Sequence, residues 1–404
     1  MKAKIFRQPK LWRFLALLGA LVMVATACGN DDGGDTQQPE ATMSPTAGGE
    51  GEQPEMPAAG SEDEPAELTE VSLQLQWVPQ SQFAGYFAAR DLGFYEDVGL
   101  DVEIIDGGLD IVPATVLDSG GADFAISWVP RGLVPREEGL NITNIAQVFQ
   151  RSGTLQVSFA EAGINEPADL AGKKVGNWGF GNEFELFAGL NSVGLDPKSD
   201  VTLVQQDFNM TALINGDIDA AQAMIYNEYA QVLETINPET GELFQPEDLR
   251  VIDWNEVGTA MLQDAIWADA DRLESHAKYR DIAVRFVEAS LRGWIHCRDN
   301  FQECVDIIMA ASPLGGPGHQ AWMMNEINAL IWPSPGGVGI MDQALYDQTI
   351  EVATSQGVLA SAPDAGAFRT DIAQEAVDNL RAAGHDVFGN NYARQDVQVT
   401  EGGQ

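Results

Sequence analysis

Short apolar runs recur along the sequence from residue 71, and stretches with helical periodicity separate most of them. Such runs, bounded by Gly, Asn, Asp or Ser, are typical of β-strands, whereas a period of 3.6 residues is typical of helices. Repeated alternation of strand and helix predicts an α/β fold with largely parallel sheets. The candidate strands are Val71–Gln76, Leu100–Ile105, Ala122–Ser127, Thr143–Phe149, Leu155–Phe159, Lys173–Asn177, Val201–Gln205, Ala220–Ile225 and Arg250–Asp253.

From about Asp269 the pattern becomes mostly helical. The candidate helices there are Tyr279–Cys297, Gln302–Ala311, Gln320–Ile331 and Asp342–Gln356. A chain of 404 residues is long enough for two domains of ordinary size. A short internal sequence similarity favours two similar lobes, because Leu117–Asp123 and Leu213–Asp219 place Leu, Gly and Asp at matching spacings. Any α/β protein can contain such turns, so the similarity alone does not decide the number of lobes.

The first 27 residues have the pattern of a secretory signal peptide. Five basic residues precede an apolar stretch, residues 14–27, that is too short for a comfortable membrane span. The run Ala25-Thr-Ala-Cys28 resembles a bacterial lipoprotein box, in which the cysteine becomes the lipidated first residue, although Ala25 stands where leucine is usual. The sequence therefore predicts a lipoprotein signal peptide at 1–27 and lipidation of Cys28, with plain secretion as the alternative.

Residues 28–70 are predicted to be an acidic, disordered tether. Residues 29–70 contain twelve acidic residues and no basic ones, so the segment cannot bury enough apolar surface to fold. The formal net charge of the chain is −39, and removal of the five basic residues of the signal takes it to −44. Such a chain would repel phosphates, which excludes nucleic acid as an expected partner.

Aromatic residues stand where several candidate strands end. Trp77, Trp128, Trp178 and Trp254 each follow a strand, and so does Tyr226. In open α/β sheets, ligands bind in the crevice beyond the carboxyl ends of the strands. These rings, together with Phe83, are therefore predicted to line a cleft and stack on a flat ligand. The alternative for each ring is ordinary core or hinge packing.

Polar residues near the same strand ends are candidates to form hydrogen bonds with the edge of a heterocycle, because amides and carboxylates offer both donors and acceptors. The alternative for each is a helix cap or a turn. The candidate polar ligand-binding residues are Gln82, Asp106, Gly107, Ser127, Asn182, Glu183, Asn227 and Glu228.

Beyond Cys28 the sequence has two cysteines, Cys297 and Cys304. On one straight helix their spacing would correspond to a rise of roughly 10 Å, which is too far for a disulfide. If residues 298–301 interrupt the helix, the pair could bridge a helix–turn–helix. The sequence leaves a disulfide and two buried thiols open.

Five motifs carry a resemblance to a known family: Leu75-Gln-Trp-Val-Pro79, Phe83-Ala-Gly-Tyr86, Gly93-Phe-Tyr95, Gly99-Leu-Asp-Val102, and the pair Gly120 and Asp123. They resemble type II solute-binding proteins of ABC importers, in the branch similar to thiamine-pyrimidine synthase, with sulfonate and taurine binders as cousins. Residues 173–185 and 224–230 resemble the subgroup that binds pyrimidine precursors of thiamine or riboflavin-like flavins.

This resemblance implies a two-lobed periplasmic-binding-protein type II fold with a hinge and an interlobe cleft. Lobe 1 would comprise residues 71–152 and 266–404, and lobe 2 residues 153–265. The crossing segments would lie near 150–156 and 254–267, and the C-terminal helices would return to pack on lobe 1.

The same family contains a pyrimidine-synthase enzyme that sacrifices a histidine of its own. Phe83 occupies the position of that histidine here, and the enzyme's cysteine cluster is absent from the sequence. No common nucleophile, zinc or dinucleotide motif occurs either, so neither an enzyme nor a metal or cofactor is expected. A sulfonate or taurine receptor, the other alternative, would want Arg or Lys in the cleft, and the strand ends supply little positive charge.

The sequence thus predicts an extracytoplasmic, lipid-anchored and monomeric solute-binding protein. It would capture a small aromatic heterocycle and deliver it to an ABC permease and its ATPase, with closure of the lobes as a hinge motion.

The lipid anchor gives the first test. Cys28→Ala should leave the protein folded but release it from membranes, since acyl chains supply the attachment. Sedimentation with membranes after a salt wash measures this. A variant that still sediments with the membranes would rule out the lipoprotein prediction.

Overall fold

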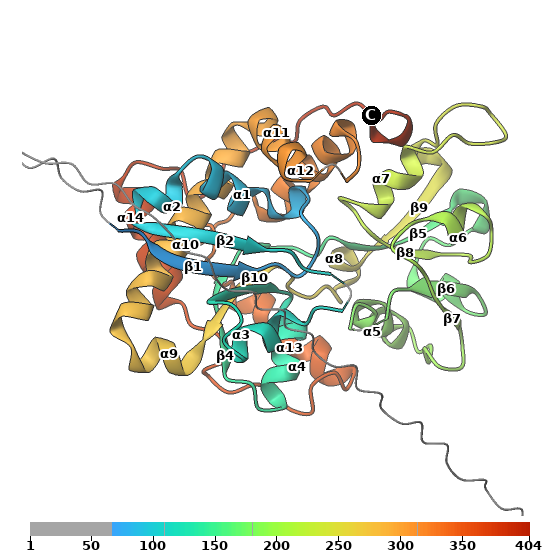
Figure 1. Ribbon diagram of the computed structural model, residues 1–404. Helices are drawn as coiled ribbons and strands as arrows, with labels where there is room; N and C mark the ends of the chain where they lie inside the picture. The colour runs from blue at the N-terminus through green and yellow to red at the C-terminus, as the bar shows by residue number, and fades with distance from the viewer. Residues whose placement is uncertain (1–66, 109, 180, 313) are drawn as a thin grey trace, which may run out of the picture. The chain divides into compact units, whose positions relative to one another are not determined.

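The computed structural model describes residues 67–108, 110–179, 181–312 and 314–404 (Figure 1). The predicted signal peptide, the predicted lipidation site Cys28 and the tether up to residue 66 lie outside the described residues. Strand β1 begins at Thr69, so it includes the last two residues of the predicted tether. Among the described helices, none is both long and apolar enough to cross a membrane.

The elements of the described residues follow the predicted alternation as far as residue 253. The strands are β1 (Thr69–Gln74), β2 (Leu100–Ile105), β3 (Phe124–Ser127), β4 (Ile142–Gln147), β5 (Thr154–Phe159), β6 (Lys174–Asn177), β7 (Thr202–Gln205), β8 (Ala221–Met224), β9 (Leu249–Asp253) and β10 (Ala265–Asp269). The α-helices are α1 (Ala84–Asp91), α2 (Phe94–Asp97), α3 (Pro113–Asp118), α4 (Val129–Glu137), α5 (Phe184–Ser192), α6 (Thr211–Ile214), α7 (Glu228–Leu233), α8 (Trp254–Val257), α9 (Ala270–Ser275), α10 (Ala277–Asp299), α11 (Phe301–Ala311), α12 (Pro317–Ile331), α13 (Gln343–Ser355) and α14 (Asp371–Ala382). Each of the nine candidate strands has a counterpart, whereas β10 had no prediction.

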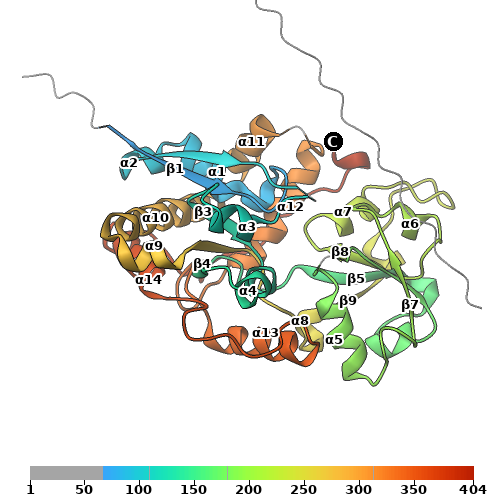
Figure 2. The same cartoon turned by 60° about the horizontal axis from the view of Figure 1, so that its bottom comes forward.

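Five strands form the first sheet, in the order β2-β1-β3-β10-β4. The remaining five form the second strand group, with β8-β5-β9 as one sheet and β6-β7 as another, joined by a bridge between Val175 and Ala220. Figure 2 shows the two groups beside each other. The chain passes between them twice, between β4 and β5 and between β9 and β10. The lobe boundaries at 152/153 and 265/266 fall in or beside these two connections and remain a prediction.

The prediction of largely parallel sheets is wrong. The pairs β1–β2, β1–β3 and β6–β7 are parallel, but β10 is antiparallel to β3 and β4, and β5 is antiparallel to β8 and β9. The reason lies in the connections. Strand β10 returns to the first sheet from the second strand group, and it enters between β3 and β4 in the opposite direction.

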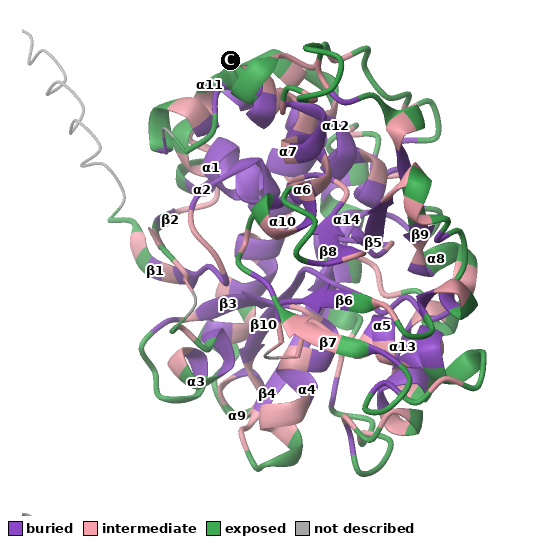
Figure 3. Cartoon of the chain, turned by 90° about the vertical axis from the view of Figure 1, so that its right-hand side faces the viewer, coloured by how far each residue is buried: buried purple, intermediate pink, exposed green. Residues whose placement is uncertain are grey.

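Helices cover both faces of the first sheet (Figure 1). One core cluster joins buried residues of β1, β2 and β3 to α1, α10, α11, α12 and α14. On the other face, Trp267 of β10 packs with residues of α3, α4 and α13. Helix α1 approaches α10 closely at Gly85, where a Cβ atom would lie only 2.3 Å from the ring of Trp294. The strands at the centre are buried, and exposed residues lie mainly in the outer helices and loops (Figure 3).

The helix that carries Cys297 ends at Asp299, and the next helix begins at Phe301. This break brings the Cα atoms of Cys297 and Cys304 to 5.4 Å, and the structure joins the two sulfur atoms in a disulfide. The bridge fastens α10 to α11 on the face of the first sheet that α1 also covers.

Candidate ligand-binding site

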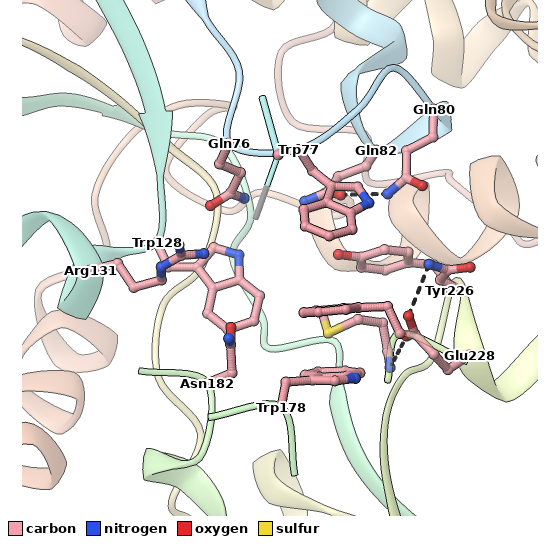
Figure 4. Close-up of a pocket in the computed structure, with 14 residues that line it drawn as sticks. Gln76, Trp77, Gln80, Gln82, Trp128, Arg131, Trp178, Asn182, Tyr226 and Glu228 are labelled. Carbon is pink, nitrogen blue, oxygen red and sulfur yellow. Dashed lines mark hydrogen bonds between the residues drawn. The ribbon is translucent and has the colours of Figure 1, made fainter. Parts of the chain in front are cut away.

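A cavity of about 80 Å³ lies where strands of both groups end (Figure 4). Trp77 follows β1, Trp128 follows β3, Trp178 follows β6 and Tyr226 follows β8. The lining residues are Gln76, Trp77, Gln80, Gln82, Gly108, Trp128, Arg131, Trp178, Asn182, Phe208, Met224, Tyr226, Asn227 and Glu228.

Three of the rings are in contact through Phe208. The ring of Phe208 lies parallel to that of Trp178, with an interplanar angle of 6° and centroids 5.7 Å apart. The Trp77 ring is tilted by 38° relative to Phe208, with the two centroids 4.8 Å apart. Both separations fall in the range of favourable aromatic pairs. The cavity is therefore bounded by flat apolar surfaces from the first sheet and from the second strand group.

The buried carboxylate of Asp264 fixes the polar side of the cavity. Its Oδ1 accepts hydrogen bonds from Gln76 Nε2 at 2.6 Å and from Trp128 Nε1 at 2.8 Å, and its Oδ2 accepts one from Gln82 Nε2 at 2.9 Å. Gln80 Nε2 in turn donates to Gln82 Oε1 at 2.7 Å. Burial raises the pKa of Asp264 to about 6, while these three donors and the charge of Arg131 oppose that rise. Asp264 thus orients cavity residues without lining the cavity.

Glu228 supplies a carboxyl group on the opposite side. Its Oε2 accepts a hydrogen bond from the Met224 N–H at 2.9 Å, and its Oε1 accepts one from Asn227 Nδ2 at 3.1 Å. Burial raises the pKa of Glu228 to about 7, and the nearby His319 opposes the rise. Near neutral pH this carboxyl group can therefore either donate or accept a hydrogen bond.

Arg131, on α4, is the one basic residue among the described residues that line the cavity. Burial lowers the pKa of its guanidinium, and the charge of Asp264 opposes that change. The strand ends supply little positive charge, as expected, and α4 adds one arginine to the site. The search for residues at the carboxyl ends of strands missed Arg131, because it is the third residue of a helix.

Eight of the fourteen predicted ligand-binding residues line the cavity. They are Trp77, Gln82, Trp128, Trp178, Asn182, Tyr226, Asn227 and Glu228. Sequence reasoning missed the other six lining residues, which are Gln76, Gln80, Gly108, Arg131, Phe208 and Met224.

Two predicted aromatic ligand contacts, Phe83 and Trp254, do not line the cavity. Phe83 ends a short 3-10 helix, η1 (Ser81–Phe83), and its side chain is fully buried in the core beneath α1. Trp254 begins α8 and packs against Gly189 of α5, where a Cβ atom would lie 2.3 Å from the indole. Both rings point into the protein, because a residue at a strand-to-helix turn can face the core as readily as the crevice.

Four predicted polar contacts do not line the cavity, and these residues hold the backbone around it. The Gly107 N–H donates to the Trp77 carbonyl at 3.0 Å, and the carbonyl of Asp106 accepts from Gln74 Nε2 at 3.0 Å. The buried Ser127 offers its carbonyl to Trp267 Nε1 at 3.0 Å. The carboxylate of Glu183 accepts from the Gly181 N–H at 3.0 Å.

A metal centre receives no support from the described residues, since no group of three or more His, Cys, Asp or Glu there is arranged to hold an ion.

The chain matches the protein family described as NMT1/THI5 like over residues 80–304. It is 26% identical over 329 residues to the riboflavin-binding protein RibY of Chloroflexus aurantiacus, in an alignment that covers 77% of this chain and 89% of that protein. It is 25% identical over 251 residues to the formylaminopyrimidine-binding protein of Halalkalibacterium halodurans, covering 62% and 72% respectively. A thiamine biosynthesis protein of Haemophilus influenzae is 29% identical over 189 residues, which are 46% of this chain and only 60% of that protein's length.

The fold resembles solved structures of solute-binding proteins. The periplasmic aliphatic sulphonate binding protein of Escherichia coli superposes with a TM-score of 0.53 and 15% sequence identity, over 76% of this chain and 91% of that one. Likeness at this level of identity establishes the two-lobed periplasmic-binding-protein type II fold and does not identify a ligand.

The raised pKa of Asp264 generates a pH-dependent prediction. Because burial raises this pKa from 3.8 to about 6, the folded protein binds the proton more tightly than the unfolded chain. The resulting stabilisation is fully present below about pH 4 and is lost as the pH rises through about 6. The free energy of unfolding of the wild type, relative to Asp264→Asn, should therefore fall across this window and then level off.

Denaturant unfolding of both proteins between pH 4 and pH 8 measures this difference. Comparison of the pair largely removes the titration of the other carboxylates. A difference that stays constant over the whole range would show that Asp264 titrates as an ordinary carboxyl group.

Proposed function

Since the chain belongs to the NMT1/THI5 like family, we propose that this solute-binding protein captures a small flat aromatic heterocycle for an ABC importer. The ligand class proposed is a pyrimidine precursor of thiamine or a riboflavin-like flavin. The protein would work outside the cytoplasm as a lipid-anchored monomer and pass its ligand to a permease driven by an ATPase.

The aromatic lining of the cavity is the observation that carries this proposal. Trp77 and Trp128 come from the first sheet, and Trp178 and Tyr226 come from the second strand group. Flat rings on both sides of a cleft suit a planar ligand, because stacked rings exclude water from both of its faces. The names of two relatives, a riboflavin-binding and a formylaminopyrimidine-binding protein, support the same ligand class.

The polar groups of the cavity suit the edge of such a ring. Asn182 and Asn227 offer amides, and Glu228 can donate or accept a hydrogen bond near neutral pH. A heterocycle with ring nitrogens and carbonyl or amino substituents needs this mixture of donors and acceptors. A site with fixed hydrogen-bond partners also rejects ligands that leave those partners unpaired.

Arg131 favours a second candidate, a ligand with a sulfonate group. A guanidinium in a cleft binds such an anion well. The nearby carboxylate of Asp264 weakens this candidate, because it offsets the positive charge of the arginine.

The pyrimidine-synthase alternative has less support, since Phe83 replaces the histidine that this chemistry consumes and its side chain is buried in the core. An assay for consumption of pyridoxal phosphate by the purified protein distinguishes the synthase from a binder.

A thermal-shift screen followed by calorimetry tests the ligand class. The probes are riboflavin, thiamine pyrimidine precursors, taurine, a sugar and an amino acid. Only riboflavin or the pyrimidines should raise the melting temperature, because a bound ligand stabilises the folded state by mass action. A response to taurine alone would refute the heterocycle proposal. In that case Arg131→Gln should abolish the response.

Truncation of two aromatic rings tests the placement of the site. Trp77→Ala should weaken binding of the heterocycle about tenfold, since stacking contributes about 0.5–1.5 kcal/mol beyond area burial and about 1.4 kcal/mol is a factor of ten. Phe83→Ala, the matched comparison, should lower the free energy of unfolding by roughly 3–5 kcal/mol and leave affinity intact in the protein that folds. Calorimetric affinity and the denaturant midpoint separate the two effects. Unchanged affinity in Trp77→Ala would mean that the ligand binds elsewhere.

A further inference from the structure

Phe208 contacts two indoles of the cavity that come from different parts of the fold. Its ring lies parallel to Trp178, which follows β6, and within 4.8 Å of Trp77, which follows β1. The phenyl ring therefore stacks on one indole and makes a tilted contact with the other. Both centroid separations fall in the range of favourable aromatic pairs, so removal of the phenyl ring would free a surface on each indole for another flat ring.

The indoles are held at their backbones. The Trp178 N–H donates to Gln222 Oε1 at 3.1 Å, and the Trp77 carbonyl accepts from the Gly107 N–H at 3.0 Å. Phe208 lies between β7 and α6, where its neighbours Asp207 and Asn209 are exposed. Among the hydrogen bonds between described residues, none uses the backbone N–H of Asp207, Phe208 or Asn209. A segment with so few backbone hydrogen bonds can move at low cost.

The small size of the cavity also indicates that a ligand needs the space of the Phe208 ring. With the phenyl ring in place the cavity measures about 80 Å³. Pockets for small molecules usually measure about 300–1,000 Å³. A flat ring held against the two indoles needs the space that Phe208 fills, and Phe208 is the least firmly held of the three rings.

We propose that Phe208 is a displaceable side chain that fills the stacking position beside Trp77 and Trp178, and that a flat heterocycle takes this position when it binds. The proposal rests on the proposed function and adds a residue that determines specificity. A ligand must stack on the indoles better than the phenyl ring does. Sugars and aliphatic amino acids lack the flat ring for that exchange, whereas a heterocycle that also bonds to Asn182 or Glu228 has it.

Phe208→Ala tests the proposal, with riboflavin and a thiamine pyrimidine precursor as probes in calorimetry. Removal of the competing ring should tighten binding of the probe that the wild type binds by about tenfold, which corresponds to about 1.4 kcal/mol. An unchanged or weaker affinity would overturn the proposal, because it would make Phe208 either irrelevant or a fixed wall of the site. Phe208→Leu provides the second variant, and its binding should tighten by a smaller factor.

Phe159→Ala is the matched control. Phe159 is also partly buried in the second strand group and packs against one aromatic ring, that of Phe244, at 5.1 Å, but it does not line the cavity. Its removal should leave affinity unchanged. If the wild-type protein binds neither riboflavin nor the pyrimidine, the proposed function is refuted, and the role of Phe208 with it. If the wild type binds a probe but Phe208→Ala does not bind it more tightly, only the displacement of Phe208 is refuted.

Discussion

The cavity depends on a single buried carboxylate. Asp264 precedes β10, and its three donors come from three other places: Gln76 after β1, Gln82 in η1 and Trp128 after β3. A buried carboxylate without partners would cost several kcal/mol, so each of these donors is held by the need to satisfy it. Charge-assisted hydrogen bonds are also stronger than neutral ones. Two amides and one indole are consequently fixed around the cavity by a residue that does not line it.

The residue before Asp264 ties the same segment to the second strand group. Gln263 Nε2 donates to Ser152 Oγ at 3.1 Å and to Thr154 Oγ1 at 2.7 Å, and its Oε1 accepts from the Gly153 N–H at 2.8 Å. Neighbouring side chains in extended backbone point in opposite directions. Gln263 and Asp264 therefore hold the two connections together on one side and the cavity on the other. In the proposed hinge motion, these hydrogen bonds would link the bending of the two connections.

How far the sequence could predict this molecule depends on whether the signal was local. Strand periodicity is local, so nine strands were found, but the direction of β10 depends on a return from another part of the fold. Trp77, Trp178 and Trp254 all follow strands, so their positions in the sequence are equivalent. Only the first two line the cavity, because the direction of a ring is decided by the residues that pack beside it. Asp264 and Phe208 lie in segments without periodicity, and only the tertiary contacts reveal them.

The charge of the cavity differs from that of the chain. The chain carries a net charge of −39, yet burial raises the pKa of Asp264 to about 6 and that of Glu228 to about 7. These two carboxyl groups are thus less ionised near neutral pH than surface carboxylates, and Arg131 opposes the charge that remains. Surface acidity therefore does not dictate the charge of the ligand. In the proposed function, selection inside the cavity is left to the flat rings and to hydrogen bonds, among them that of Glu228, which can donate or accept.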